Sequence, residues 1–161
     1  MIKANQRKET KMISKYKRIL AAVDGSYESE LAVEKAINVA LRNDAVLLLA
    51  HVIDVKAYQG DAMVSDYVFD TQEEHAKEVL RYYEKMARGR GVSSIKKIIE
   101  RGNPKKLLAS DIPEKEQADL IMVGATGLNT FERLLIGSTS EYILRHAKKD
   151  LLVVRNCEKT L

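Results

Sequence analysis

Cysteine and aromatic residues are scarce in this chain, and their scarcity excludes several kinds of site. The single cysteine, Cys157, allows neither an intrachain disulfide nor a metal cluster held by several cysteines. There is no tryptophan and there are only two phenylalanines, which argues against a platform on which nucleic-acid bases stack. The three histidines, His51, His75 and His146, are far apart and lack the spacing of metal ligands. We therefore expect each histidine to be structural or solvated.

Long hydrophobic runs are also missing. The longest strictly apolar run, Ala45–Ala50, is far shorter than a membrane-spanning helix. The N-terminus is basic, but no apolar segment of signal-peptide length follows it. A chain of 161 residues is the usual size of one domain and can bury a substantial core. We expect a single-domain cytoplasmic protein without a membrane segment.

Positive charge is concentrated at the start of the chain. Residues 1–18 carry seven Lys or Arg against one acid, Glu9, so the remaining residues sum to −2 although the whole chain carries +4. In a domain that binds nucleic acid, the excess of basic residues would lie on the surface of the folded domain. We expect residues 1–16 to form a flexible, solvated leader and 157–161 a short tail. Binding of nucleic acid by the leader is the alternative, and the less favoured one.

Apolar runs alternate with segments of helical periodicity along the rest of the chain. The runs predict buried strands at 18–23, 45–53, 94–100, 118–123 and 151–154, the third with the polar residues of a sheet edge. Helices are predicted after Ser26 or Ser29, over 70–88, from Asn103-Pro104, and over 138–147, with a long loop over 55–69. This order predicts a three-layer α/β sandwich around a five-stranded, mostly parallel, twisted sheet of Rossmann-like type.

A glycine motif follows the fourth predicted strand. The motif begins with Gly124 and Gly127 and continues, after nine intervening residues, with Gly137-Ser138. The last predicted helix begins there, with residues typical of a capped helix start. Glycine lets backbone N–H groups approach an anion, and a helix N-terminus adds free donors and the positive end of its dipole. The motif therefore predicts a phosphate site; three turn glycines with an ordinary cap are the plainer alternative.

Acidic residues lie at the ends of the first two predicted strands. In parallel sheets, ligands bind outside the carboxyl ends of the strands where the strand order reverses, and Asp24, 52–54 and Gly124 all belong to that rim. Asp24 could hold a phosphate-bound Mg²⁺ through carboxylate oxygen, or it could instead help to cap the first helix. For Asp54 a functional role and a loop role are equally open.

The motifs of several enzyme classes are absent. The sequence has no Gly-x₄-Gly-Lys-Ser/Thr loop and no Gly-x-Gly-x-x-Gly after Val23. The turn after the first strand, Val23–Ser26, is not the His-x-Gly-His or Ser-Gly-Gly-x-Asp-Ser turn of nucleotidyl transferases or pyrophosphatases. Nothing resembles a nucleophile paired with a base. We expect no catalytic residues and at most weak hydrolysis.

The sequence resembles the universal stress protein family over about residues 17–156, and its glycine motif resembles that of the ATP-binding branch. The matching segments end or follow the predicted strands: Val23–Ser26, His51–Asp54, Arg101–Pro104, Ala118–Gly124 and Leu151–Arg155. The resemblance implies a fold of the adenine nucleotide alpha hydrolase-like type. It also implies ATP as the ligand, with Mg²⁺ or Mn²⁺.

The resemblance further implies which residues contact the nucleotide. Asp24 would lie beside ribose and phosphates, the backbone of Val52 would meet the adenine edge, and the glycines with their hydroxyl residues would hold the phosphates. The complete set implied is Ala22, Asp24, Val52, Val123, Gly124, Thr126, Gly127, Gly137, Ser138, Thr139 and Ser140. Two positions depart from the family: many relatives have a basic residue or histidine where Thr126 stands, and proline is frequent where Ala22 stands.

The same resemblance implies a nucleotide-dependent sensor or switch in the stress response, acting on an unidentified protein partner. It also implies a homodimer through the last strand, Leu151–Val154, which agrees with the aggregation hazard of an apolar open edge. Two alternatives stay open: an enzyme that hydrolyses ATP slowly, and a dimeric scaffold without nucleotide.

Overall fold

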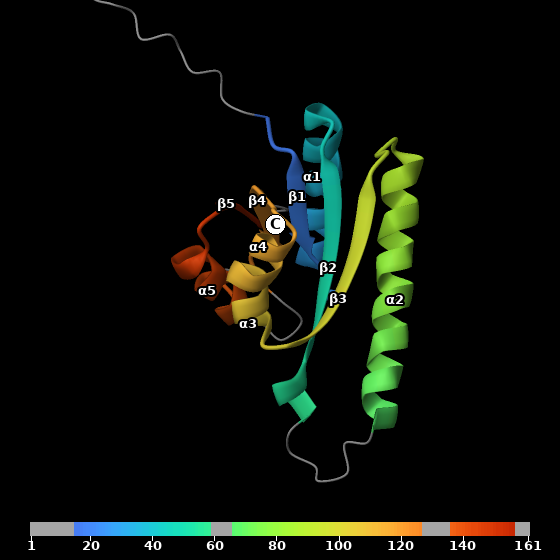
Figure 1. Ribbon diagram of the computed structural model, residues 1–161, viewed down its shortest axis with the longest axis vertical. Coiled ribbons are helices and arrows are strands. Elements are labelled where there is room, and N and C mark those ends of the chain that lie inside the picture. Colours follow the sequence, from blue (N-terminus) through green and yellow to red (C-terminus); the bar gives the residue numbers. More distant parts are fainter. Residues whose placement is uncertain (1–14, 59–65, 127–135, 157–161) are drawn as a thin grey trace, which may run out of the picture.

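Runs of aliphatic residues form the five strands at the centre of the fold. The computed structural model describes residues 15–58, 66–126 and 136–156 (Figure 1). All neighbouring strands are parallel, in the order β3-β2-β1-β4-β5. The strand order reverses between β1 and β4, which is the kind of position where ligands bind in parallel sheets. The strands are β1 Arg18–Ala22, β2 Val46–Asp54, β3 Ile95–Gly102, β4 Leu120–Gly124 and β5 Asp150–Val154.

Helices cover both faces of the sheet, which confirms the predicted three-layer α/β class. One face carries α1 (Tyr27–Asn43) and α2 (Asp66–Gly89), and the other carries α3, α4 and α5 (Figure 1). Ser26 caps α1 by accepting the N–H of Ser29 at 3.1 Å. The remaining elements are a 3₁₀ turn Val55–Tyr58, α3 Pro104–Lys106, a π-helical turn Leu107–Asp111, α4 Ile112–Lys115 and α5 Ser138–His146.

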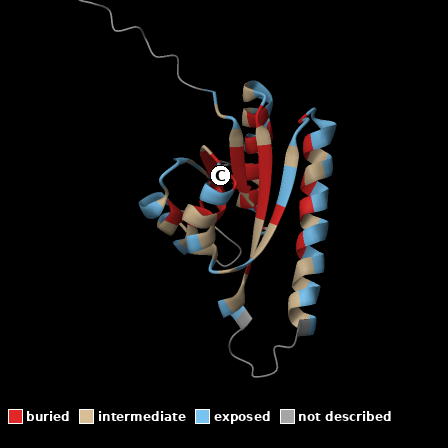
Figure 2. Cartoon of the chain, in the orientation of Figure 1, coloured by how far each residue is buried: buried red, intermediate tan, exposed pale blue. Residues whose placement is uncertain are grey.

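Two apolar clusters, one on each face of the sheet, form the core. Leu47 and Leu49 of β2 pack toward α1 and α2, whereas Leu48 between them packs toward α4 and α5. This division follows from the alternation of side chains along a strand. Figure 2 shows the buried residues running along the middle of β1 and β2. Among the described residues, no helix is both long enough and apolar enough to cross a membrane.

Helix α2 begins earlier than the sequence indicates. The predicted loop over 55–69 is wrong at both ends, because a 3₁₀ turn occupies Val55–Tyr58 and α2 starts at Asp66 rather than near residue 70. The first turn is held by contacts from another element, which periodicity cannot reveal. The guanidinium of Arg101, near the end of β3, lies 5.4 Å from the centre of the Phe69 ring.

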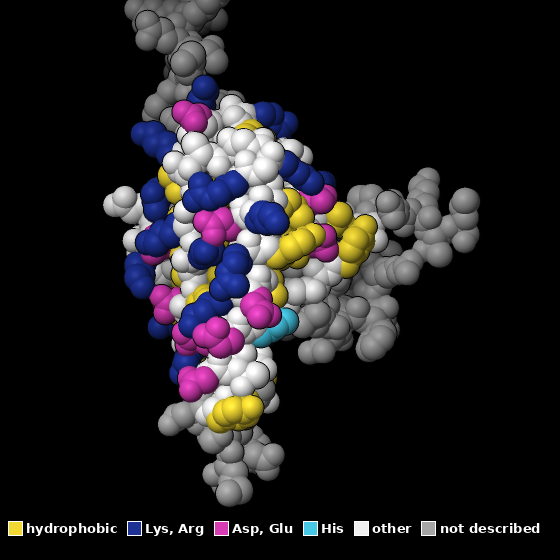
Figure 3. Space-filling view, turned by 90° about the vertical axis from the view of Figure 1, so that its right-hand side faces the viewer, with side chains coloured by type: hydrophobic (Ala, Val, Ile, Leu, Met, Phe, Trp, Pro, Cys, Tyr) yellow, Lys and Arg dark blue, Asp and Glu magenta, His cyan; other side chains and the backbone are white. Residues whose placement is uncertain are grey.

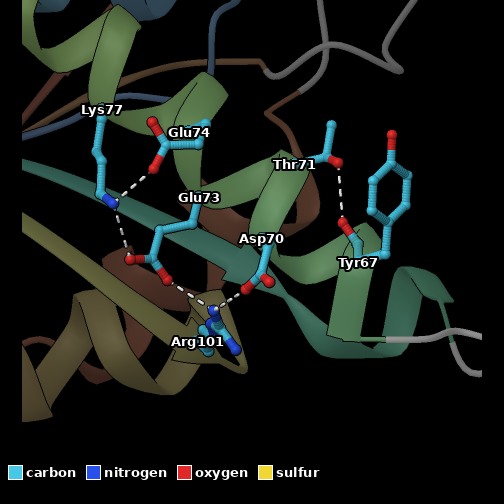
Figure 4. Close-up of polar contacts among 7 residues, drawn as sticks. All are labelled: Tyr67, Asp70, Thr71, Glu73, Glu74, Lys77 and Arg101. Atoms are coloured by element: carbon cyan, nitrogen blue, oxygen red, sulfur yellow. Dashed lines mark hydrogen bonds and ion pairs between the residues drawn. The ribbon is translucent and has the colours of Figure 1, made fainter.

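Arg101 also pairs with the acidic side of α2 (Figure 4). Its Nη2 lies 2.6 Å from Glu73 and 3.8 Å from Asp70, and Lys77 approaches Glu73 from the next turn at 3.3 Å. Hydrogen bonds from Arg101 and Lys77 hold the pKa of Glu73 below its ordinary value. These ion pairs connect the first turns of α2 with the end of β3.

The two edges of the sheet differ in character. On the edge strand β3, Lys96 and Lys97 are exposed and pair with Glu116 at 2.6 Å and Glu84 at 2.5 Å. Figure 3 shows this side of the molecule, where Lys and Arg side chains are interspersed with Asp and Glu. Charge on an edge strand discourages pairing with another chain, so the predicted edge is confirmed and protected. The opposite edge, β5, carries Leu151–Val154 instead.

Gly124, at the end of β4, permits the closest approach between β4 and α1. A Cβ at this position would lie 2.8 Å from the carbonyl carbon of Glu28 and 2.9 Å from the nitrogen of Ser29. Both are backbone atoms in the first turn of α1, so a side chain here would force the helix away from the sheet. Gly124 is therefore required by packing, whatever its role toward a ligand.

We expect Gly124→Ala to lower the free energy of unfolding by about 1–3 kcal/mol, since the added methyl overpacks against backbone. Urea unfolding monitored by circular dichroism measures this change. The matched control is Gly89→Ala, where no atom lies within 4 Å of the new Cβ; its unfolding free energy should stay the same or rise by less than about 1 kcal/mol. Equal stability of the two variants would contradict the packing role.

Candidate functional site

A cavity opens at the carboxyl ends of β1, β2 and β4, where the strand order reverses. Its volume is about 290 Å³, and α5 and the start of α3 complete its wall. Every predicted site residue within the described ranges lines it, whereas Gly127 lies outside those ranges. The predicted residues that the structure brings together here are Ala22, Asp24, Val52, Val123, Gly124, Thr126, Gly137, Ser138, Thr139 and Ser140.

The wall also contains residues that the sequence analysis did not assign to the site. Pro104, Leu108 and Ile143 join Val52 as apolar lining, and Val23 and Ser29 line the cavity near the start of α1. Leu108 lies in the π-helical turn that follows α3. Apolar spacing along a helix does not distinguish a residue that fills the core from one that lines a cavity, so no local pattern could have found these positions.

The N-terminus of α5 contributes backbone donors. The first hydrogen bond within this helix runs from Glu141 N–H to Gly137 O at 2.9 Å, so the N–H groups of Ser138, Thr139 and Ser140 precede it. All three residues line the cavity. The helix begins at Ser138, as predicted, and its N-cap is Gly137, which offers no side chain to cap the first turn.

The end of β4 is fastened to its neighbours by a set of short hydrogen bonds. Ala125 N–H donates to Val154 O at 2.7 Å, and Gly137 N–H donates to Ala125 O at 2.7 Å. The Ser140 hydroxyl donates to Gly124 O, also at 2.7 Å. The bond between Gly137 and Ala125 joins both ends of the glycine motif, so its first and last residues are held at one place.

Glu28, in the first turn of α1, binds the residue that begins the glycine segment. Its Oε2 accepts the Thr126 N–H at 2.5 Å and the Thr126 hydroxyl at 2.7 Å. Thr126 lines the cavity as predicted, but both of its protons point to Glu28. This carboxylate could not be found from the sequence, because the partners are separated by 98 residues and meet only through the packing of α1 on β4.

Asp24 and Asp54 both lie on the rim, and each supports its own turn. Asp24 Oδ1 accepts the Ser26 N–H at 2.9 Å across Gly25, whose φ of +81° requires glycine. Asp54 Oδ1 accepts the Lys56 N–H at 2.9 Å. Asp24 therefore supports the turn into α1, as its alternative role required, while its carboxylate also lines the cavity.

The cavity wall carries negative charge only. Asp24 and Asp54 line it, and no Lys or Arg from the described parts of the chain does so. Within those same parts, no group of three or more His, Cys, Asp or Glu could hold a metal ion. A divalent cation would thus find one or two carboxylates here, and phosphate oxygens would have to supply most of its ligands.

His51 lies on β2 next to Val52 but does not line the cavity. Its Nδ1 is 2.8 Å from Val23 O, which fixes the proton on that nitrogen because a carbonyl can only accept. Burial lowers the pKa of His51, which favours the neutral ring. The histidine is structural, as expected: it ties β2 to the turn that carries Asp24.

Comparison with known proteins identifies the family. The model of the universal stress protein family matches residues 15–155. A universal stress protein of Staphylococcus aureus (strain USA300) is 42% identical over 143 residues, covering 89% of this chain and 86% of the relative.

Solved structures agree. UspA of Lactobacillus plantarum superposes with a TM-score of 0.81 at 32% identity, covering 89% of this chain and all of that one. A universal stress protein in complex with cAMP superposes with a TM-score of 0.68 at 26% identity, covering 88% and 98%. This chain belongs to the universal stress protein family.

Proposed function

We propose that this protein binds ATP, together with Mg²⁺ or Mn²⁺, in the cavity at the carboxyl ends of β1, β2 and β4. Bound nucleotide would make it a sensor or switch for a protein partner in the cytoplasmic stress response. One observation carries the proposal: residues of the α5 N-terminus, with their free N–H groups, and residues of the glycine motif line the same cavity. The structural relative in complex with cAMP supports an adenine nucleotide as the class of ligand.

The two kinds of lining residue suit the two ends of a nucleotide. Val52 and Leu108 offer an apolar surface for the adenine ring. The N–H groups of Ser138, Thr139 and Ser140 offer donors for the phosphates, helped by the Ser138 and Thr139 hydroxyls. The Ser140 hydroxyl is already bound to Gly124 O, so this residue contributes its backbone.

The cation would be held mainly by the nucleotide. Asp24 is the exposed carboxylate of the cavity wall, and carboxylate oxygen is a ligand that Mg²⁺ accepts alongside phosphates. We assign Asp24 to this role and leave Asp54 as a residue of the rim. When bound, the cation would offset the phosphate charge, which the wall of the cavity cannot do.

We expect purified protein to bind ATP, and Gly137→Val to weaken binding at least about tenfold, or by about 1.4 kcal/mol. Gly137 has φ −63° and ψ 152°, which any residue adopts, so the variant should fold and lose only the close approach of a phosphate. Calorimetry with Mg-ATP, and mass analysis of small molecules released from the purified protein, measure this. Gly89→Ala serves as the control. Undiminished affinity in folded Gly137→Val would contradict the site.

We expect hydrolysis of the bound ATP to be slow, with steady-state turnover below about 1 s⁻¹. Phosphoryl transfer needs positive charge at the transferring group, and the described wall offers only backbone donors and hydroxyls. Arg133, the basic residue of the segment between Gly127 and Gly137, lies outside the described residues. Faster turnover that is lost in Ser138→Ala would instead favour the enzyme; failure of the purified protein to bind nucleotide would favour the scaffold.

We further propose a homodimer through β5. This strand ends the sheet, and Leu152 is 40% exposed between the half-buried Leu151 and Val153. Beyond Asp150 at its start, β5 lacks charges of the kind that protect β3, and pairing with a second copy about a two-fold axis would cover its apolar part.

Val153→Lys should therefore convert the dimer to monomer in sedimentation-velocity experiments, because it places a charge at the paired edge. The matched control is Tyr82→Lys, a change at a residue of α2 that is 57% exposed on the other side of the sheet. A dimer that persists in Val153→Lys, with Tyr82→Lys behaving like wild type, would contradict the β5 interface.

A further inference from the structure

The carboxylate of Glu28 joins three segments of the chain beside the cavity. Oε2 accepts both protons of Thr126, and Oε1 accepts the backbone N–H of Asn156 at 3.4 Å, just beyond β5. Glu28 can reach both because Gly124 lets the first turn of α1 press against the end of β4. The carboxylate is thus fixed in place and only half-buried.

This carboxylate determines what Thr126 can offer to a ligand. The Thr126 hydroxyl has one proton, which it donates in the hydrogen bond to Glu28. Toward the cavity the hydroxyl oxygen can therefore only accept a hydrogen bond. The Thr126 backbone N–H is taken as well. Thr126 therefore suits a ribose hydroxyl or a metal-bound water, both of which donate, and repels a phosphate oxygen.

Glu28 also adds to the negative charge around the cavity. Asp24 and Asp54 line the wall, and the Glu28 carboxylate lies 2.7 Å behind the Thr126 hydroxyl, which belongs to that wall. Basic side chains are missing from the described lining. Charges separated by the width of one side chain interact measurably at the dielectric of a protein surface.

We propose that Glu28 is a specificity-determining residue of the nucleotide site, which makes the site select adenine nucleotides whose phosphate charge is low or is neutralised by a divalent cation. The inference rests on the proposed function. In this account metal-free ATP, which carries the most negative charge, is the ligand that the Glu28 carboxylate penalises most. The cyclic diester of cAMP, with a single charge, is penalised least.

A purely structural role of Glu28 leads to a different expectation. If Glu28 only held Thr126 in place, its loss would weaken every adenine nucleotide by a similar factor. If the charge of Glu28 selects among nucleotides, the change in affinity on losing that charge must grow with the negative charge of the ligand. Glu28→Gln separates these cases, because its amide oxygen can still accept both hydrogen bonds from Thr126 while the charge is removed. Besides the charge, only the long hydrogen bond from the Asn156 N–H is lost.

The test is calorimetry with cAMP, ADP and ATP in EDTA, and with ATP plus Mg²⁺, on wild type and Glu28→Gln. We expect the variant to bind metal-free ATP about threefold to tenfold more tightly than wild type and to bind cAMP within about twofold of wild type. A uniform change for all ligands, or none, would overturn the inference while leaving the proposed function intact. If wild type binds no adenine nucleotide under any condition, both fall.

Glu30→Gln is the matched control, since Glu30 lies in the same helical turn and loses the same charge. It faces α2, where burial of Tyr83 and the neighbouring charge of Glu30 raise the pKa of Tyr83 to about 12. We expect wild-type affinities for every nucleotide in this variant. The same selective tightening in Glu30→Gln would overturn the assignment to Glu28.

A measurement on wild type alone tests the charge argument without any variant. Salt screens repulsion, so raising NaCl from about 50 mM to about 500 mM should improve the affinity for metal-free ATP relative to cAMP. A site that attracts phosphate through net positive charge would show the opposite trend. A fall in the ATP to cAMP affinity ratio with salt would therefore overturn the inference even if Glu28→Gln failed to fold.

Discussion

The close approach of α1 to the end of β4 is the constraint on which the rest of the site depends. At Gly124 the two elements are separated by less than the room a methyl group needs. This approach carries Glu28 to Thr126 and places Ser29 on the cavity wall. The Ser29 hydroxyl is also the acceptor for the Asp24 N–H at 3.4 Å. A larger residue at position 124 would disturb the ligand rim and the packing of the sheet together.

The chemistry of the site follows from the topology of the sheet. Because the strand order reverses between β1 and β4, their carboxyl ends diverge and leave a cavity that α5 closes with its N-terminus. What the described wall offers to an anion is therefore backbone donors and hydroxyls rather than basic side chains. No basic side chain of the described wall would neutralise the charge that develops on a transferring phosphate, so this task would fall to a cation bound with the nucleotide.

Most of the fold could be predicted from local patterns. Buried parallel strands such as Leu47–Ala50 have continuous apolar runs, and Asn103-Pro104 carries the start of its helix in two residues. The start of α2 could not be predicted in this way, since Arg101 of β3 stabilises its first turns through Phe69 and Glu73. Propensity is a weak guide wherever tertiary contacts decide where a helix begins.

The site could be predicted to the level of positions but not of contacts. Strand ends and glycine spacing were enough to choose Asp24, Gly124 and Gly137-Ser138, which line one cavity, and the resemblance to the family implied the other positions. These patterns could not reveal that Thr126 donates two hydrogen bonds to Glu28, or that Gly124 is needed for the packing of α1. Both features depend on contacts between elements that are distant in sequence. The resemblance to the family suggested Thr126 as a nucleotide contact, and only the geometry identified the carboxylate behind it.

In the proposed function, an adenine nucleotide occupies the cavity with its phosphates at the α5 N-terminus. Titration of isotope-labelled protein with Mg-ATP, followed by amide NMR shifts, tests it most directly. We expect the largest shifts at Ser138, Thr139 and Val52, with little change at Lys96 and Lys97 on the far edge of the sheet. Shifts concentrated on the charged face of α2 and β3, with the cavity residues unchanged, would contradict it.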